Sequence, residues 1–129
     1  MDRNTPMDRD TPLDDVTTFT VGRVRHDEEN GICLISGADD EEEPAGYFII
    51  QIEKGDPDGP LIEVFGEDLT QSDGVVSLEI GVRHLLFTFE PTSTIGSEMP
   101  AVRIESETEI APIVRTRLTL AFGKRVARA

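Results

Sequence analysis

The residue types that usually carry chemistry are few and widely separated in this chain. His26 and His84 are the two histidines, and Cys33 is the single cysteine. No H-E-x-x-H or H-x-H spacing joins the histidines into a metal motif, and we expect each of them at a strand end or on the surface. Cys33 lies in the apolar run ICLIS, where a thiol behaves as a small buried side chain. We therefore expect no catalytic residue, no metal ligand and no cofactor, and hence no enzyme.

Other sites are supported only by fragments. The segment Asp56-Pro57-Asp58-Gly59 matches part of a calcium loop, but Phe65 stands where an EF-hand loop has its glutamate. No serine stands in a G-x-S-x-G turn, and no glycine-rich phosphate loop is present. Carboxylates are abundant enough to meet by chance, so a small hydrolase that uses a carboxylate or a histidine is the weaker alternative.

The acidic residues gather in the segments that we expect to be turns. The chain has 26 acidic and 12 basic side chains, for a net charge of -14. Between residues 27 and 109 the only bases are Lys54, Arg83 and Arg103, whereas residues 110–129 contain no acid. A dense negative surface repels phosphates, so nucleic acid and anionic membranes are poor partners and a basic protein is a better one. Solvated acidic loops with no partner are the alternative.

Length and composition indicate one domain of 129 residues. Residues 1–16 contain the near-repeat MDRNTP and MDRDTP, which has no apolar face, and we expect a disordered leader there. We assign residues 17–123 to the domain and 124–129 to a basic tail. No apolar run is long enough to span a membrane and no signal peptide is recognisable, so we expect a cytoplasmic protein.

From residue 17 onward the sequence is typical of β-structure. Asn30-Gly31 predicts a tight hairpin turn between TTFTVGRVR and ICLIS, and residues 37–46 should form an exposed loop. Residues 47–53 are apolar on both faces, which predicts a central strand. Further strands are expected at 61–65, 75–80, 84–90 and 102–104. The residues expected to face the core from the paired strands are Val76, Leu78 and Ile80, with Leu85, Phe87 and Phe89.

Residues 109–122 fit two periods. As a strand, alternate residues from Val114 to Phe122 would share one face. As a helix, Thr108 would be the N-cap and Gly123 would end it, with Ile110, Ile113, Val114, Leu118 and Phe122 on one face. The boundary residues favour the helix. The expected fold class is α+β, with one antiparallel sheet of six or seven strands and one C-terminal helix.

Four successive segments carry a pattern that extends over the domain: ICLISGADDEEEPAGYFIIQ, LIEVFGEDLTQSDGVVSLEI, RHLLFTFEP and VRIESETEIAPIVRTRLTLAFG. The positions that define it are Tyr47, Gln51, Ile62, Glu63, Gly74, Leu118 and Phe122. In this order and at these positions the chain resembles the immunity protein 10 family of bacterial polymorphic toxin systems. The resemblance implies an antidote protein that binds a cognate toxin and blocks its active site or its substrate path.

We expect the partner to be that toxin, with a basic surface, and the contact to lie in the acidic loops. Tyr47 would supply an aromatic anchor, because tyrosine is enriched among residues that dominate binding energy. The candidate partner-binding residues are Asp39, Asp40, Glu41, Glu42, Glu43, Tyr47, Glu67 and Asp68. The main alternative is an acidic regulatory or accessory protein that mimics nucleic acid.

Overall fold

Residues 16–40, 42–56 and 58–128 are described by the computed structural model, and they form ten strands, two short 3-10 helices and one α-helix. The strands are β1 (Val16–Val21), β2 (Arg25–Glu29), β3 (Ile32–Ala38), β4 (Tyr47–Glu53), β5 (Leu61–Val64), β6 (Thr70–Gln71), β7 (Val75–Ile80), β8 (His84–Phe89), β9 (Ala101–Ser106) and β10 (Val126–Arg128). The helices are η2 (Glu67–Leu69), α1 (Pro112–Phe122) and η3 (Gly123–Arg125). Within the described residues, no helix is long and apolar enough to cross a membrane.

The strands form two sheets of five strands, and the expectation of one antiparallel sheet is wrong. Sheet A has the order β1-β9-β8-β7-β10, and both of its edge strands pair in parallel with their neighbours. Sheet B has the order β2-β3-β4-β5-β6 and is antiparallel throughout. The α+β class with one C-terminal helix is confirmed.

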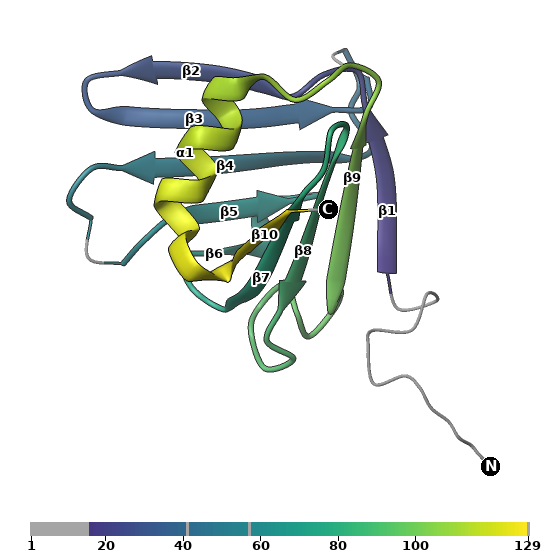
Figure 1. Ribbon diagram of the computed structural model, residues 1–129. Coiled ribbons are helices and arrows are strands. Elements are labelled where there is room, and N and C mark those ends of the chain that lie inside the picture. Colours follow the sequence, from purple (N-terminus) through teal and green to yellow (C-terminus); the bar gives the residue numbers. More distant parts are fainter. Residues whose placement is uncertain (1–15, 41, 57, 129) are drawn as a thin grey trace.

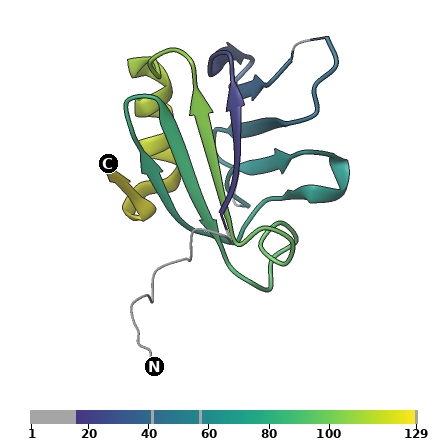
Figure 2. The ribbon, with the colours of Figure 1, turned by 90° about the vertical axis from the view of Figure 1, so that its right-hand side faces the viewer.

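One face of sheet B is covered jointly by sheet A and by α1 (Figures 1 and 2). The opposite face, which we call the outer face of sheet B, is covered by no other element of the described part of the chain (Figure 2). On this outer face Leu34 and Leu61 are each 37% exposed. β4 is the central strand of sheet B, as predicted, but only Phe48 and Ile50 on its core face are fully buried.

A single apolar core joins the two sheets and the helix. Sheet B contributes Ile35, Phe48, Ile50, Ile62 and Val64, sheet A contributes Leu78, Leu85, Phe87, Phe89, Val102 and Ile104, and α1 contributes Val114, Leu118 and Phe122. The ring of Phe87 stacks on Phe89 at 5.8 Å and meets the edge of Phe122 at 6.0 Å between centroids. Cys33 is buried among these residues, as predicted.

The Asn30-Gly31 turn is confirmed, but it joins different strands from those expected. Asn30 has φ 55° and Gly31 has φ 82°, the left-handed pair that a two-residue hairpin turn requires. The turn connects β2 to β3. β1 lies outside this hairpin and pairs with β9 in sheet A, because the chain leaves β1 at Gly22 before it enters β2.

The residues predicted to face the core are confirmed on β8, and the prediction is wrong at one position of β7. Leu85, Phe87 and Phe89 are all buried. On β7 the register shifts between Val75 and Ser77, so Val75 is buried and Val76 is 50% exposed. An irregularity of this kind inserts an extra residue into one strand and reverses the alternation that the sequence pattern assumes.

The C-terminal helix starts later than predicted, at Pro112, with Ala111 rather than Thr108 as its N-cap. Proline fits this position because the first helical N–H has no intrahelical acceptor. The helix ends at Gly123 as predicted, where φ is 59°. Ile110 is buried but precedes the helix, and Ile113 is 38% exposed.

The segment expected to be a basic tail belongs to the fold. Residues 123–125 form η3, and β10 pairs in parallel with β7. The Arg125 guanidinium lies 5.1 Å from the ring centre of Phe122 and donates to the Val75 carbonyl. Most of the expected leader lies outside the described residues, but Val16 already belongs to β1, so the domain begins before residue 17.

We expect Phe87→Ala to lower the free energy of unfolding by about 3–5 kcal/mol, because it removes a buried ring that contacts both sheet A and α1. Val82→Ala is the matched control: Val82 is 62% exposed, and we expect a change within about 0.5 kcal/mol. Urea unfolding followed by circular dichroism measures both values. Equal effects would contradict the shared core.

Candidate partner-binding site

The loop between β3 and β4 is organised by its own first two carboxylates. Asp39 accepts hydrogen bonds from the backbone N–H groups of Ala45 at 3.0 Å and Gly46 at 2.9 Å. Asp40 accepts one from the N–H of Glu42 at 2.9 Å. Two of the predicted contact residues therefore hold the loop closed. Predicted contact residue Glu41 lies outside the described residues.

The base of this loop is packed against β5. Gly46 lies between the rings of Phe19 and Phe65, and a β-carbon at this position would approach each ring to 3.1 Å. The N–H of Phe65 donates to the Tyr47 carbonyl at 3.0 Å. This close approach favours glycine at position 46, and the hydrogen bond places Phe65, which precedes η2, beside the base of the loop.

The acidic loop and η2 lie at the same end of sheet B. Ala38 pairs with Tyr47, and Phe48 pairs with Val64. β3 therefore ends, β4 begins and β5 ends at this same end of the sheet. The structure thus brings together carboxylates that are far apart in the sequence. We call this group the acidic end of sheet B; it consists of Asp40, Glu42, Glu43, Glu67 and Asp68, and all five residues are exposed.

Other loop acids lie at the opposite end of the sheet and do not join this group. Ile32 pairs with Glu53 at the end of sheet B from which the β2–β3 turn and the β4–β5 loop emerge. Asp27, Glu29, Glu53 and Asp58 are exposed in or near these segments. Among the described residues, the negative charge of sheet B is therefore divided between two ends and forms no single continuous rim.

Tyr47 lies on the outer face of sheet B, next to the acidic end, with its hydroxyl already bonded. The phenol donates to Glu63 Oε2, and Thr70 donates to the other oxygen of the same carboxylate at 3.2 Å. The hydrogen bond to Glu63, with burial and the nearby charges of Glu63 and Glu67, raises the pKa of Tyr47 to about 12. The ring, rather than the hydroxyl, is therefore the part that a partner would meet.

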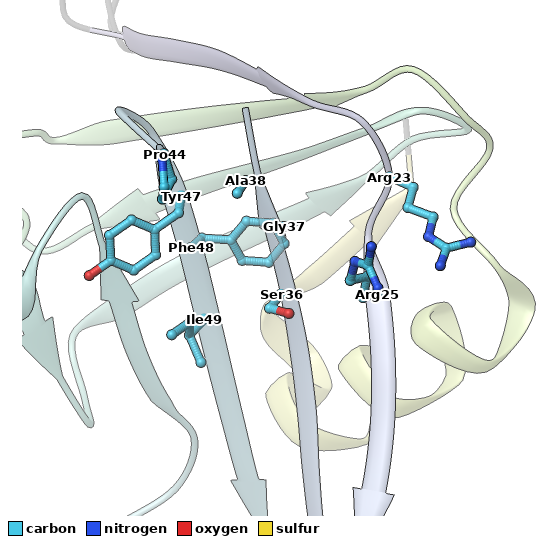
Figure 3. A pocket seen from close by; sticks show the side chains of 9 residues that line it. All are labelled: Arg23, Arg25, Ser36, Gly37, Ala38, Pro44, Tyr47, Phe48 and Ile49. Carbon is cyan, nitrogen blue, oxygen red and sulfur yellow. The ribbon is translucent and has the colours of Figure 1, made fainter. Parts of the chain in front are cut away.

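A shallow pocket of about 340 Å³ adjoins Tyr47 on the outer face (Figure 3). Tyr47 and Ile49 lie on one side of it, and Arg23 and Arg25 lie on the other. These arginines were not predicted as part of the site, because they precede β3 in the chain and reach Tyr47 only through the pairing of β2 with β3 and β3 with β4. They give an otherwise acidic surface a local positive border.

Each of the two histidines pairs with a glutamate. His26 is less isolated than predicted, because its partner Glu28 also contacts Arg117. Nε2 of His84 lies 2.8 Å from Glu79, and Nε2 of His26 lies 2.7 Å from Glu28. Glu28 also contacts the Arg117 guanidinium at 2.6 Å, and the hydrogen bonds from Arg117 and His26 lower the pKa of Glu28. The expectation that the chain has no H-x-E spacing is wrong, because His26-Asp27-Glu28 has this spacing and residues i and i+2 of a strand share a face.

No protein-family model matches this chain, and no curated protein matches it.

The Tyr47–Glu63 bond can be tested optically, because the chain has one tyrosine and no tryptophan. We expect an absorbance titration to give a midpoint at about 12 for the folded chain. Glu63→Gln should lower this midpoint toward about 10, the ordinary value. The protonated phenol is favoured by the fold, so its stabilisation is complete below pH ~10 and is lost as pH rises from there through about 12.

Thr70→Val is the control for that titration, because it removes the second hydrogen bond to Glu63 without touching the phenol. Circular dichroism at each pH confirms that the chain stays folded. A midpoint near 10 in the native chain, unchanged in Glu63→Gln, would show that the bond does not form.

Proposed function

We propose that this chain is an immunity protein that binds a cognate polymorphic toxin with a basic surface and neutralises it. The acidic end of sheet B makes the first contact, and the side chains of Leu34, Tyr47, Ile49 and Leu61 on the outer face of sheet B form the rest of the interface. The chain acts by occupying the toxin and does not break bonds itself.

The observation that carries this proposal is the convergence of Glu42 and Glu43 with Glu67 and Asp68 at one end of sheet B. Exposed like charges repel one another, and a cationic partner removes that repulsion when it binds. A concentrated negative patch also accelerates the encounter with a basic protein well beyond the rate for neutral surfaces. An antidote benefits from such speed, because it must reach the toxin before the toxin reaches its substrate.

The uncovered outer face of sheet B supports a specific rather than a purely electrostatic contact. Leu34 and Leu61 are each 37% exposed, and Ile49 and Tyr47 are half-buried beside them. Protein interfaces commonly have a central patch of apolar and aromatic side chains within a polar, charged rim. Tyr47 joins the two parts, because its ring lies on this face and its hydroxyl is tied to Glu63.

The charge of the acidic end also indicates how the toxin would be blocked. A nuclease toxin holds phosphate with cationic side chains, and carboxylates compete for the same groups. If the acidic end occupies them, the substrate is excluded without any chemical step. A nucleic-acid-mimicking regulator would use the same chemistry on another basic protein and is the second candidate.

The test is growth rescue and binding with the toxin encoded beside this chain's gene. We expect co-expression of the native chain to restore growth. The variant E42Q/E43Q/E67Q/D68N removes four charges from the acidic end and leaves Asp39 and Asp40 in place to hold the loop. It should lower the association rate constant about tenfold or more at low salt and flatten its salt dependence.

The matched control is D27N/E29Q/E53Q/D58N, which removes the same amount of charge from the opposite end of sheet B. We expect this control to retain most of the association rate. Equal losses in the two variants would reject the acidic end as the contact. Failure of the native chain to rescue growth or to bind that toxin would reject the immunity function and favour the regulator.

A further inference from the structure

Three side chains with different metal-binding atoms meet on the α1-facing side of sheet B. His26 and Glu28 lie two residues apart on β2 and share a face, and Glu28 pairs directly with Cys33 on β3. One imidazole nitrogen, one carboxylate oxygen and the thiol sulfur all lie within 4.8 Å of one another. This side is opposite to the one that carries Tyr47.

Glu28 and Cys33 border a groove between α1 and the hairpin end of sheet B, and His26 lines a second hollow beside the first turn of α1. The groove has a volume of about 700 Å³, and Glu28, Cys33, Ile52, Arg117 and Leu120 help to line it. The Cys33 side chain is only 6% exposed, yet it forms part of the groove wall. A small ion can therefore reach the sulfur from the groove without an opening of the core.

A cation already lies against this cluster. Oε2 of Glu28 receives His26 Nε2 at 2.7 Å and Arg117 Nε at 2.6 Å. The Arg117 side chain is 35% exposed and that of Glu28 is 39% exposed. The contact thus shows that positive charge is accommodated beside Glu28, above the sulfur.

We propose that His26, Glu28 and Cys33 bind one divalent transition-metal ion of the zinc type, with its fourth position open to the groove. Sulfur, imidazole nitrogen and carboxylate oxygen are the ligands that zinc accepts together, and three protein ligands with one open position are a common zinc arrangement. Calcium and magnesium require oxygen ligands and do not fit this set. The ion would replace the Arg117 guanidinium at Glu28 Oε2.

The relative strengths of the two interactions allow this replacement. An exposed ion pair such as Glu28–Arg117 contributes little to stability, because water and salt screen it. Bonds from zinc to a thiolate and an imidazole are much stronger, and in small domains they are strong enough to drive folding. Arg117 can remain next to the other carboxylate oxygen, from which its Nη2 is 3.3 Å away, and orient that ligand.

The test uses the reduced full chain titrated with Co²⁺ and then with Zn²⁺. Co²⁺ bound to a thiolate gives a sulfur-to-metal charge-transfer band, which we expect to saturate at one ion per chain and to disappear when Zn²⁺ displaces it. His26→Gln, Glu28→Gln and Cys33→Ser should each weaken Zn²⁺ binding at least about tenfold, since even the loss of an outer-shell partner costs that much.

His84→Gln is the matched control, because His84 and Glu79 form a similar pair at 2.8 Å on sheet A. We expect it to keep full binding, and thermal unfolding checks that every variant is folded. If Cys33→Ser does not fold, the charge-transfer band of the native chain and the His26→Gln variant, at a side chain that is 22% exposed, still decide the question. Absence of the band, binding unaffected by His26→Gln, or binding lost in His84→Gln would overturn the proposal.

Discussion

The apolar core shared by the two sheets and α1 is the constraint on which the rest of the structure depends. Each strand alternates its side chains, so the inward row of sheet B is committed to the core and the outward row is left for other contacts. On β4 this places Phe48 and Ile50 inside and Tyr47 and Ile49 outside. The core also ends at β2, where His26 and Glu28 replace apolar residues beneath α1. Both proposed sites therefore follow from where the core stops.

Local signals in the sequence predicted the local structure well. Asn30-Gly31 requires a left-handed pair and gives a two-residue turn, and Gly123 ends α1 because it adopts a positive φ. The division into two sheets was not predictable in this way, because β1 pairs with β9 across most of the chain. The predicted burial of Val76 was wrong for a different reason, because the irregularity on β7 reverses the alternation from which that burial was inferred.

The same distinction applies to the sites. The acidic loop between β3 and β4 is visible in the sequence. Its position beside η2 depends on the pairing that places the end of β3, the start of β4 and the end of β5 at the same end of sheet B. The cluster of His26, Glu28 and Cys33 was partly predictable from the sequence, because a two-residue turn that pairs Glu29 with Ile32 also pairs Glu28 with Cys33. The contact of Arg117 with Glu28 was not predictable from the sequence, since it depends on how α1 packs across the sheet.

Hydrogen–deuterium exchange of the chain, alone and bound to its toxin, tests the central claim most directly, because it locates the contact without altering a residue. If the acidic end of sheet B is the contact, backbone amides in residues 39–46 and 66–71 should exchange more slowly in the complex. Amides in 27–32 and 53–59, at the other end of the sheet, should be unchanged. Protection confined to that second group would contradict the claim.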